Sequence, residues 1–190
     1  MNKRFSQIDS IVLSLAMIVI AAVFSGLGFS IYFLIHYSIV LATIMKILLI
    51  LIGFIILPYL LIRFLDIKIE YSKLSRKTTF ILFILITCLS LYFLHSGEVI
   101  HSFFIALGEE ILFRMYILSI LLQSFSKKQS IFLGSLLFAF VLHLNGNLFV
   151  NAIVKLPASF ILYYIADRFG IQASIGFHWS HNLLVGYLFG

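Results

Sequence analysis

The sequence feature that most constrains the fold is a long uncharged stretch near the start of the chain. Residues 10–45 contain no Asp, Glu, Lys or Arg, and most of them are apolar. A membrane-spanning helix needs about 20 predominantly apolar residues, so this stretch is too long for one span. A polar break at His36 and Tyr37 divides it into two predicted spans, residues 11–34 and 38–62.

The composition of the whole chain supports a membrane protein. Of the 190 residues, 63% are hydrophobic and 11% are charged, whereas a soluble domain is about 45–50% apolar and about 25% charged. These values exclude an ordinary soluble enzyme, and they exclude intrinsic disorder, which requires low hydrophobicity. Because the apolar runs are long and do not alternate, they predict helices rather than barrel strands.

The basic residues indicate how the chain crosses the membrane. Ten of the thirteen Lys and Arg residues lie in four segments, 1–10, 63–78, 126–129 and 167–170. Because cytoplasmic loops are rich in Lys and Arg, we predict an all-α transmembrane bundle of about seven spans with a cytoplasmic N-terminus. The net charge of +6 is then explained by topology, and no nucleic-acid partner is expected. The later spans are expected at residues 79–94, 102–125, 130–144 and 148–166 and from 171 to the C-terminus.

Polar residues divide this single membrane domain into two parts. Three spans within residues 1–97, which we predict to be accessory, contain Lys46 as their only acidic or basic residue. An ionisable group in a bilayer costs at least about 2.5–3.5 kcal/mol, so a cluster of such groups is a candidate functional site. The four spans of residues 98–190 contain that cluster: Glu109, Glu110, Arg114, His143, Lys155, His178, His181 and Asn182.

Three charged residues lie close together in the fourth predicted span. Glu110 and Arg114 are four residues apart and face each other on a helix. Glu109 lies about 100° away around the helix and has no cation near it in the sequence. A carboxylate in such a position suits a general base. The alternative is a structural ion-pair cluster that joins helices.

Three further polar residues lie in two other predicted spans. His143 ends an apolar run, and His178 and Asn182 share one face of the last span because they are four residues apart. Taken singly, His143 fits an interfacial residue and Asn182 an interhelical hydrogen bond. Together with Glu109, they form a set that can activate water and bind an oxyanion. We expect His181, which is not part of this set, either to be a packing residue or to support the site residues from outside.

These residues resemble the CPBP family, the CAAX-processing and bacteriocin-processing or self-immunity intramembrane endopeptidases, also called the Abi family. The resemblance rests on Glu109-Glu110 with Arg114, on His143 and on His178 with Asn182, within residues 100–187. It implies that Glu109 and His143 activate the attacking water. It further implies that His178 and Asn182 stabilise the oxyanion, and that Glu110 and Arg114 support the first helix. The family's second motif has Phe four residues before its His, where this chain has Ala139.

The need for a metal and the position of Lys155 are separate questions. A catalytic zinc takes three protein ligands, which Glu109, His143 and His178 can supply. The glutamate-dependent mechanism of the family requires no metal, so we predict that no cofactor is needed, with zinc as the alternative. Lys155 either extends to the membrane surface or lines the cavity and pairs with Glu109 or Glu110. We expect Pro157 to kink the sixth span.

The sequence therefore predicts an intramembrane endopeptidase that hydrolyses a peptide bond of a membrane-associated peptide or protein. Its expected setting is bacteriocin processing or self-immunity in a bacterial plasma membrane, in contact with lipid. A non-catalytic immunity or regulatory protein that binds a partner is the alternative. A small transporter or proton relay ranks last, because no pair of matched half-helix breaks is evident. Nothing in the sequence specifies an oligomeric state.

Overall fold

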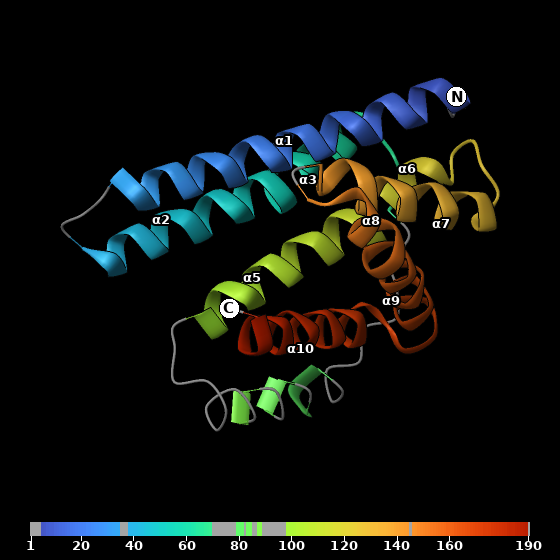
Figure 1. Ribbon diagram of the computed structural model, residues 1–190. Coiled ribbons are helices and arrows are strands. Elements are labelled where there is room, and N and C mark those ends of the chain that lie inside the picture. The colour runs from blue at the N-terminus through green and yellow to red at the C-terminus, as the bar shows by residue number, and fades with distance from the viewer. Residues whose placement is uncertain are drawn as a thin grey trace.

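The computed structural model describes residues 5–34, 38–69, 79–81, 83–84, 87–88, 98–144 and 146–189. Within these residues every regular element is helical, and no strand occurs, which confirms the all-α prediction (Figure 1). The helices are α1 (Gln7–Leu34), α2 (Ile39–Leu51), η1 (Ile52–Ile56), α3 (Leu57–Phe64), α5 (Glu98–Ile111), η2 (Leu112–Ile117), α6 (Leu118–Leu121), α7 (Lys127–Leu136), η3 (Leu137–Leu142), α8 (Leu148–Val150), η4 (Asn151–Lys155), α9 (Leu156–Phe169) and α10 (Ile171–Phe189).

Three helical segments are long and apolar enough to cross a membrane by length and composition. They are Gln7–Leu34, Val40–Phe64 and Leu148–Phe169. Three more helical rods follow the expected order, over residues 98–121, 127–142 and 171–189, so the predicted count of about seven is roughly matched. The predicted span at 79–94 lies mostly outside the described residues, and its described parts are helical.

Several predicted helix boundaries differ from the structure by a few residues, two of them in the second half of the chain. The rod expected at 102–125 covers 98–121, and the rod expected to begin at residue 130 begins at Lys127. A capping box causes the earlier start: the Ser126 side chain accepts from the backbone of Gln129, whose side chain accepts from the backbone of Ser126. This reciprocal pairing satisfies donors that a helix N-terminus otherwise leaves free.

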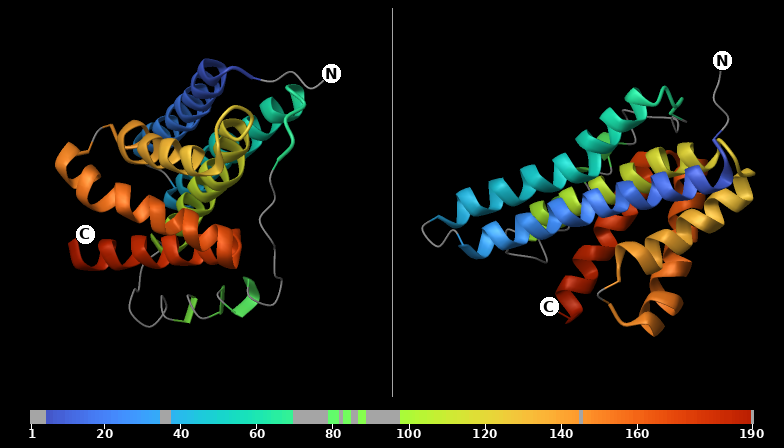
Figure 2. Two further views of the ribbon diagram at one scale, coloured as in Figure 1. Left: turned by 90° about the vertical axis from the view of Figure 1, so that its right-hand side faces the viewer. Right: turned by 90° about the horizontal axis from the view of Figure 1, so that it is seen from above.

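The helices form two packed groups around α5. Helices α1 and α2 lie side by side, and η1 packs against both α1 and α5 (Figures 1 and 2). Helix α10 packs against α5 from the other side and also contacts α9. The larger apolar core therefore joins α1 to the middle of the α5–α6 rod through Met17, Phe54, Phe113 and Ile117.

A turn at Gly170 sends α10 back across the bundle. Its φ is 96°, a conformation that side chains bearing a Cβ rarely adopt. Directly after it, α10 runs along α5, where Trp179 and Leu183 pack on Ala106. The indole Nε1 of Trp179 donates to the carbonyl of Val99 at 3.0 Å. These contacts place the polar residues of α10 beside those of α5.

Each of the two prolines follows a π-helical turn. Pro58 comes two residues after η1, and Pro157 comes two residues after η4. Proline lacks a backbone N–H, and its ring clashes with the carbonyl four residues earlier. The preceding turn, with i→i+5 rather than i→i+4 bonds, accommodates the ring while the helical segment continues. Pro157 thus adjoins a local change of helix type in the sixth span.

Candidate active site

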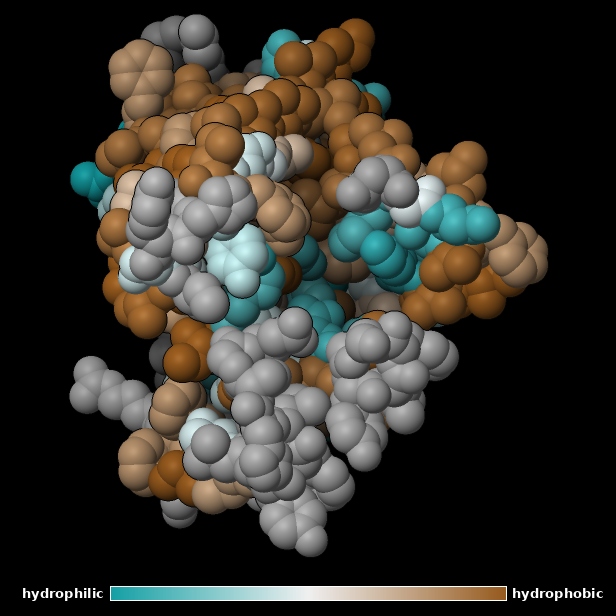
Figure 3. All heavy atoms as spheres, turned by 60° about the vertical axis from the view of Figure 1, so that its left-hand side comes forward, coloured by the Kyte–Doolittle hydropathy of each residue, from teal (hydrophilic) through white to brown (hydrophobic). Residues whose placement is uncertain are grey.

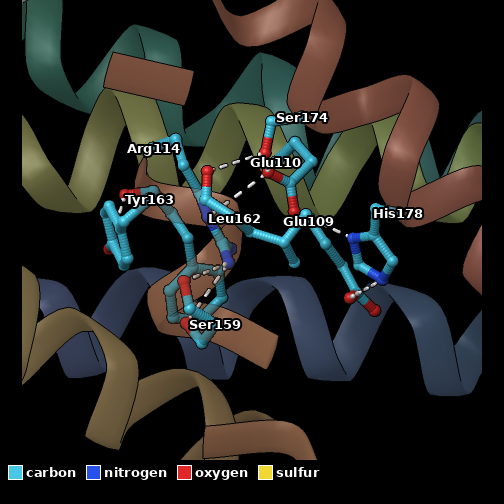
Figure 4. Close-up of polar contacts among 9 residues, drawn as sticks. Glu109, Glu110, Arg114, Ser159, Leu162, Tyr163, Ser174 and His178 are labelled. Atoms are coloured by element: carbon cyan, nitrogen blue, oxygen red, sulfur yellow. Dashed lines mark hydrogen bonds and ion pairs between the residues drawn. The ribbon is translucent and has the colours of Figure 1, made fainter. Parts of the chain in front are cut away.

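The centre of the site is the buried carboxylate of Glu110 (Figure 4). Its Oε2 lies 3.3 Å from Arg114 Nε, and both side chains are fully buried. Its Oε1 lies 2.8 Å from His178 Nδ1, and its Oε2 also contacts the Ser174 hydroxyl. The i,i+4 spacing therefore produces the expected Glu110–Arg114 pair, and α10 supplies two partners that local sequence does not reveal.

Arg114 is held from several sides. Its Nη2 donates to Ser159 Oγ at 3.2 Å, and its guanidinium lies 4.8 Å from the ring centroid of Phe138 and 4.7 Å from that of Tyr163. The Tyr163 hydroxyl in turn donates to the Phe113 carbonyl at 3.0 Å. Cation–π contacts of this kind gain strength when desolvated. Arg114 thus joins α9 and η3 to the helix that bears both glutamates.

Glu109 points in a different direction from Glu110, as Figure 4 shows. Its side chain keeps 11% of its surface exposed, and its Oε2 lies 3.6 Å from His178 Nε2. The imidazole of His178 therefore lies between the two glutamates, with one ring nitrogen toward each. Because an ionised carboxylate can only accept hydrogen bonds, the contact with Glu110 places a proton on His178 Nδ1.

His143 lies directly after the π-helical turn η3. Its Nδ1 is 2.9 Å from the carbonyl of Phe138, and since a carbonyl can only accept, Nδ1 carries the proton. The Phe138 ring also packs on the imidazole at a centroid distance of 5.0 Å. The π-helical i→i+5 register brings Phe138, rather than Ala139, onto the histidine. This register explains the departure from the family's motif.

Two asparagines fix the turn that follows His143. Asn147 caps α8 through its side-chain oxygen, and Asn151 Nδ2 donates to the His143 carbonyl at 2.8 Å. Asn151 is 1% exposed, so it belongs to the support of the site. Sequence reasoning missed it. The only sequence signal for Asn151 was a polar residue within an apolar run, one helical turn after the Asn-Gly-Asn segment.

A cavity of about 420 Å³ opens beside these groups. Figure 3 shows hydrophilic side chains gathered in a hollow on this face of an otherwise largely apolar surface. His181 is exposed and lines the cavity, so it is not a packing residue, and the alternative of a supporting position stays a prediction. The polar and charged residues that line the cavity are Ser102, Glu109, His143, Lys155, His178, His181 and Asn182. One space therefore collects Glu109, His143, His178 and Asn182 from three parts of the chain.

The sequence names Glu109, His143 and His178 as the residues that a zinc ion would use. Within the described part of the chain, no group of three His, Cys, Asp or Glu side chains is placed to hold one. The Nδ1 of His178 is occupied by Glu110, and its Nε2 faces the Glu109 carboxylate at 3.6 Å. The three zinc ligands named from the sequence do not form a ligand set here.

Comparison with known protein families gives one match. Residues 98–184 match the sequence model described as type II CAAX prenyl endopeptidase Rce1-like. The matched region, a little under half of the chain, is similar to this family. The match agrees with the CPBP resemblance, and the matched region includes all six predicted site residues. No curated protein and no solved structure matches the chain significantly. By its description, the family that this region resembles consists of CAAX prenyl endopeptidases.

Proposed function

We propose that this protein hydrolyses a peptide bond of a membrane-associated peptide or protein, using water activated by Glu109 and His143. The observation that carries the proposal is the shared cavity, which Glu109, His143, His178 and Asn182 all line. The family match supplies the reaction class. The apolar remainder of the cavity wall, including Ile105, Leu162 and Phe177, suits a hydrophobic peptide segment.

Water activation follows from the proton positions. His143 carries its proton on Nδ1, so Nε2 is free to accept a hydrogen bond from water. The Glu109 carboxylate accepts the other proton of that water. When the water oxygen attacks the peptide carbonyl, Glu109 takes up the proton and later delivers it to the leaving amine. Proton transfer by a positioned side chain contributes about 10²–10⁴ in rate.

Oxyanion stabilisation requires a donor on His178 Nε2. Because Nδ1 already donates to Glu110, a proton on Nε2 makes the ring an imidazolium. Two carboxylates, Glu109 and Glu110, then face two cations, Arg114 and His178, so the group is neutral as a whole. The Asn182 side-chain amide is the second donor toward the developing oxyanion. Such preorganised donors lower the barrier most in water-excluded sites.

The experiment is the Glu109→Gln variant, which keeps the shape of the side chain but removes the base. We expect hydrolysis of a pool of hydrophobic peptides in proteoliposomes to fall by about 10²–10⁴, measured by mass spectrometry of the products. His143→Ala and His178→Ala should lose activity as well. His101→Ala is the control, because this histidine of α5 instead contacts Phe29. Full activity in all three folded site variants would refute the proposal.

We also propose that the reaction needs no metal. Wild-type hydrolysis should persist after dialysis against a chelator, whereas loss that is restored by zinc would favour the zinc alternative.

The biological setting is bacteriocin processing or self-immunity in a bacterial plasma membrane. Resistance of cells to a bacteriocin should disappear with Glu109→Gln if immunity depends on cleavage. Resistance that survives in this variant would favour the second candidate, a non-catalytic immunity protein that binds its partner.

A further inference from the structure

Lys155 is a charged residue that the catalytic set does not use. It is the last residue of η4, in the span whose helix α9 packs against α10, and it lines the same cavity as Glu109 and His143. Across the described ranges, however, no hydrogen bond or ion pair joins Lys155 to another residue.

A cation without a partner in a membrane span is unfavourable, because little water is present to solvate it. The sequence allows Lys155 either to extend to the membrane surface or to line the cavity. In the structure it lines the cavity. The neighbouring charges do not neutralise it in the proposed mechanism. Glu110 pairs with Arg114, and Glu109 faces an imidazolium at His178. Lys155 is therefore the surplus positive charge of the cavity.

We propose that Lys155 binds a carboxylate of the peptide substrate and thereby selects which peptides enter the cavity. A carboxylate is the anion that a peptide carries, at its C-terminal end or on Asp and Glu side chains. When the carboxylate binds, the Lys155 ammonium donates a charge-assisted hydrogen bond to it, and such bonds are stronger than those between neutral groups. This inference rests on the proposed function, since it assigns a substrate group to the same cavity.

The proposal also sets the register of cleavage. Because Lys155 and Glu109 line the same cavity, a carboxylate held at Lys155 places the reacting bond at a limited distance along the peptide. A substrate without that carboxylate can still enter the apolar part of the cavity. Such a substrate lacks the contact with Lys155 that would hold the peptide in one position. We therefore expect Lys155 to affect KM more than kcat.

Binding can be measured without cleavage in the Glu109→Gln protein in lipid nanodiscs. The probes are three pools of short hydrophobic peptides that carry a photo-cross-linker. One pool has a free C-terminal carboxylate, the second has a C-terminal amide, and the third has the amide and one Glu. We expect cross-linking of the two carboxylate pools to exceed that of the uncharged pool by about tenfold or more.

Lys155→Met should lower capture of both carboxylate pools to the level of the uncharged pool, and Lys155→Arg should keep the preference. The matched control is Lys128→Met, which removes a cation from the first turn of α7, an exposed position. A difference between the two carboxylate pools tells which carboxylate is bound. Equal capture of charged and uncharged pools by the protein with Lys155 intact would overturn the proposal.

A second outcome would also overturn it. If Lys155→Met lowered capture of all three pools equally, Lys155 would support the cavity rather than bind a carboxylate. Failure of the proposed function looks different, because Glu109→Gln would then hydrolyse peptides as fast as the wild type. Fluorescence of Trp179, the only tryptophan of the chain, reports whether each variant keeps α5 and α10 packed together.

Discussion

The helices of residues 7–64 and those of residues 98–189 occupy the same apolar surroundings but bury different side chains. Lys46 is the only buried Asp, Glu, Lys, Arg or His among the described residues of the first region, where it lies 3.8 Å above the Phe29 ring. In the second region Glu109, Glu110, Arg114 and His178 are all buried. Desolvation opposes every one of these charges. The second region tolerates them because each is placed beside a partner.

The difference also shows what the first region contributes. Helix η1 packs directly on α5, and a Cβ at Gly108 would lie only 3.0 Å from the Cβ of Phe54. Gly108 immediately precedes Glu109. The apolar first region therefore supports the helix that presents the carboxylate, although it contributes no polar residue to the described lining of the cavity. Its function in this site is positional.

The largest effect on stability is expected from a buried charge of the second region. Arg114→Met leaves Glu110 without its guanidinium partner at 3.3 Å, so the free energy of unfolding should fall by about 3–5 kcal/mol. Lys46→Met in the first region, where the apolar stem is retained, should cost clearly less. Thermal unfolding in detergent, followed by Trp179 fluorescence, measures both. Equal losses in the two variants would remove the distinction between the regions.

A glycine in each region tests how tightly the helices pack. At Gly134 an added Cβ would overlap the Tyr163 hydroxyl and lie 2.9 Å from its Cζ, so Gly134→Ala should cost about 1–3 kcal/mol. At Gly26 nothing lies within 4 Å of an added Cβ. There Gly26→Ala should stabilise α1 by about 0.5–1 kcal/mol. The same unfolding measurement decides, and destabilisation by Gly26→Ala would contradict the open packing of that helix face.

The smallest effect is expected at an exposed ion pair of the second region. Lys127 Nζ lies 2.5 Å from Asp167 Oδ1, and the two side chains are 56% and 57% exposed. Lys127→Met should therefore change the free energy of unfolding by at most about 1 kcal/mol, and less at high salt. If Lys127→Met lowered the free energy of unfolding as much as Arg114→Met does, burial would not explain the difference between the Lys127–Asp167 and Glu110–Arg114 pairs.

Some features of the site were predictable because they are local. The i,i+4 spacing of Glu110 and Arg114 predicts their contact, and the offset of Glu109 predicts its different direction. The contact of Phe138 with His143 was not predictable, because an α-helical count points to Ala139. Only the π-helical turn changes that register. Asn151 was missed for a similar reason, since its hydrogen bond returns to the backbone of a preceding turn.

The sequence by itself determined the membrane environment, the helical class and the identity of the candidate site residues. Each of these follows from composition, apolar run length or spacing within one helix, which are local properties. The tertiary structure decided that His178 joins Glu109 and Glu110 from 68 residues away, and that Lys155 and His181 line the cavity. Such contacts depend on how separate helices pack and on the register of their π-helical turns.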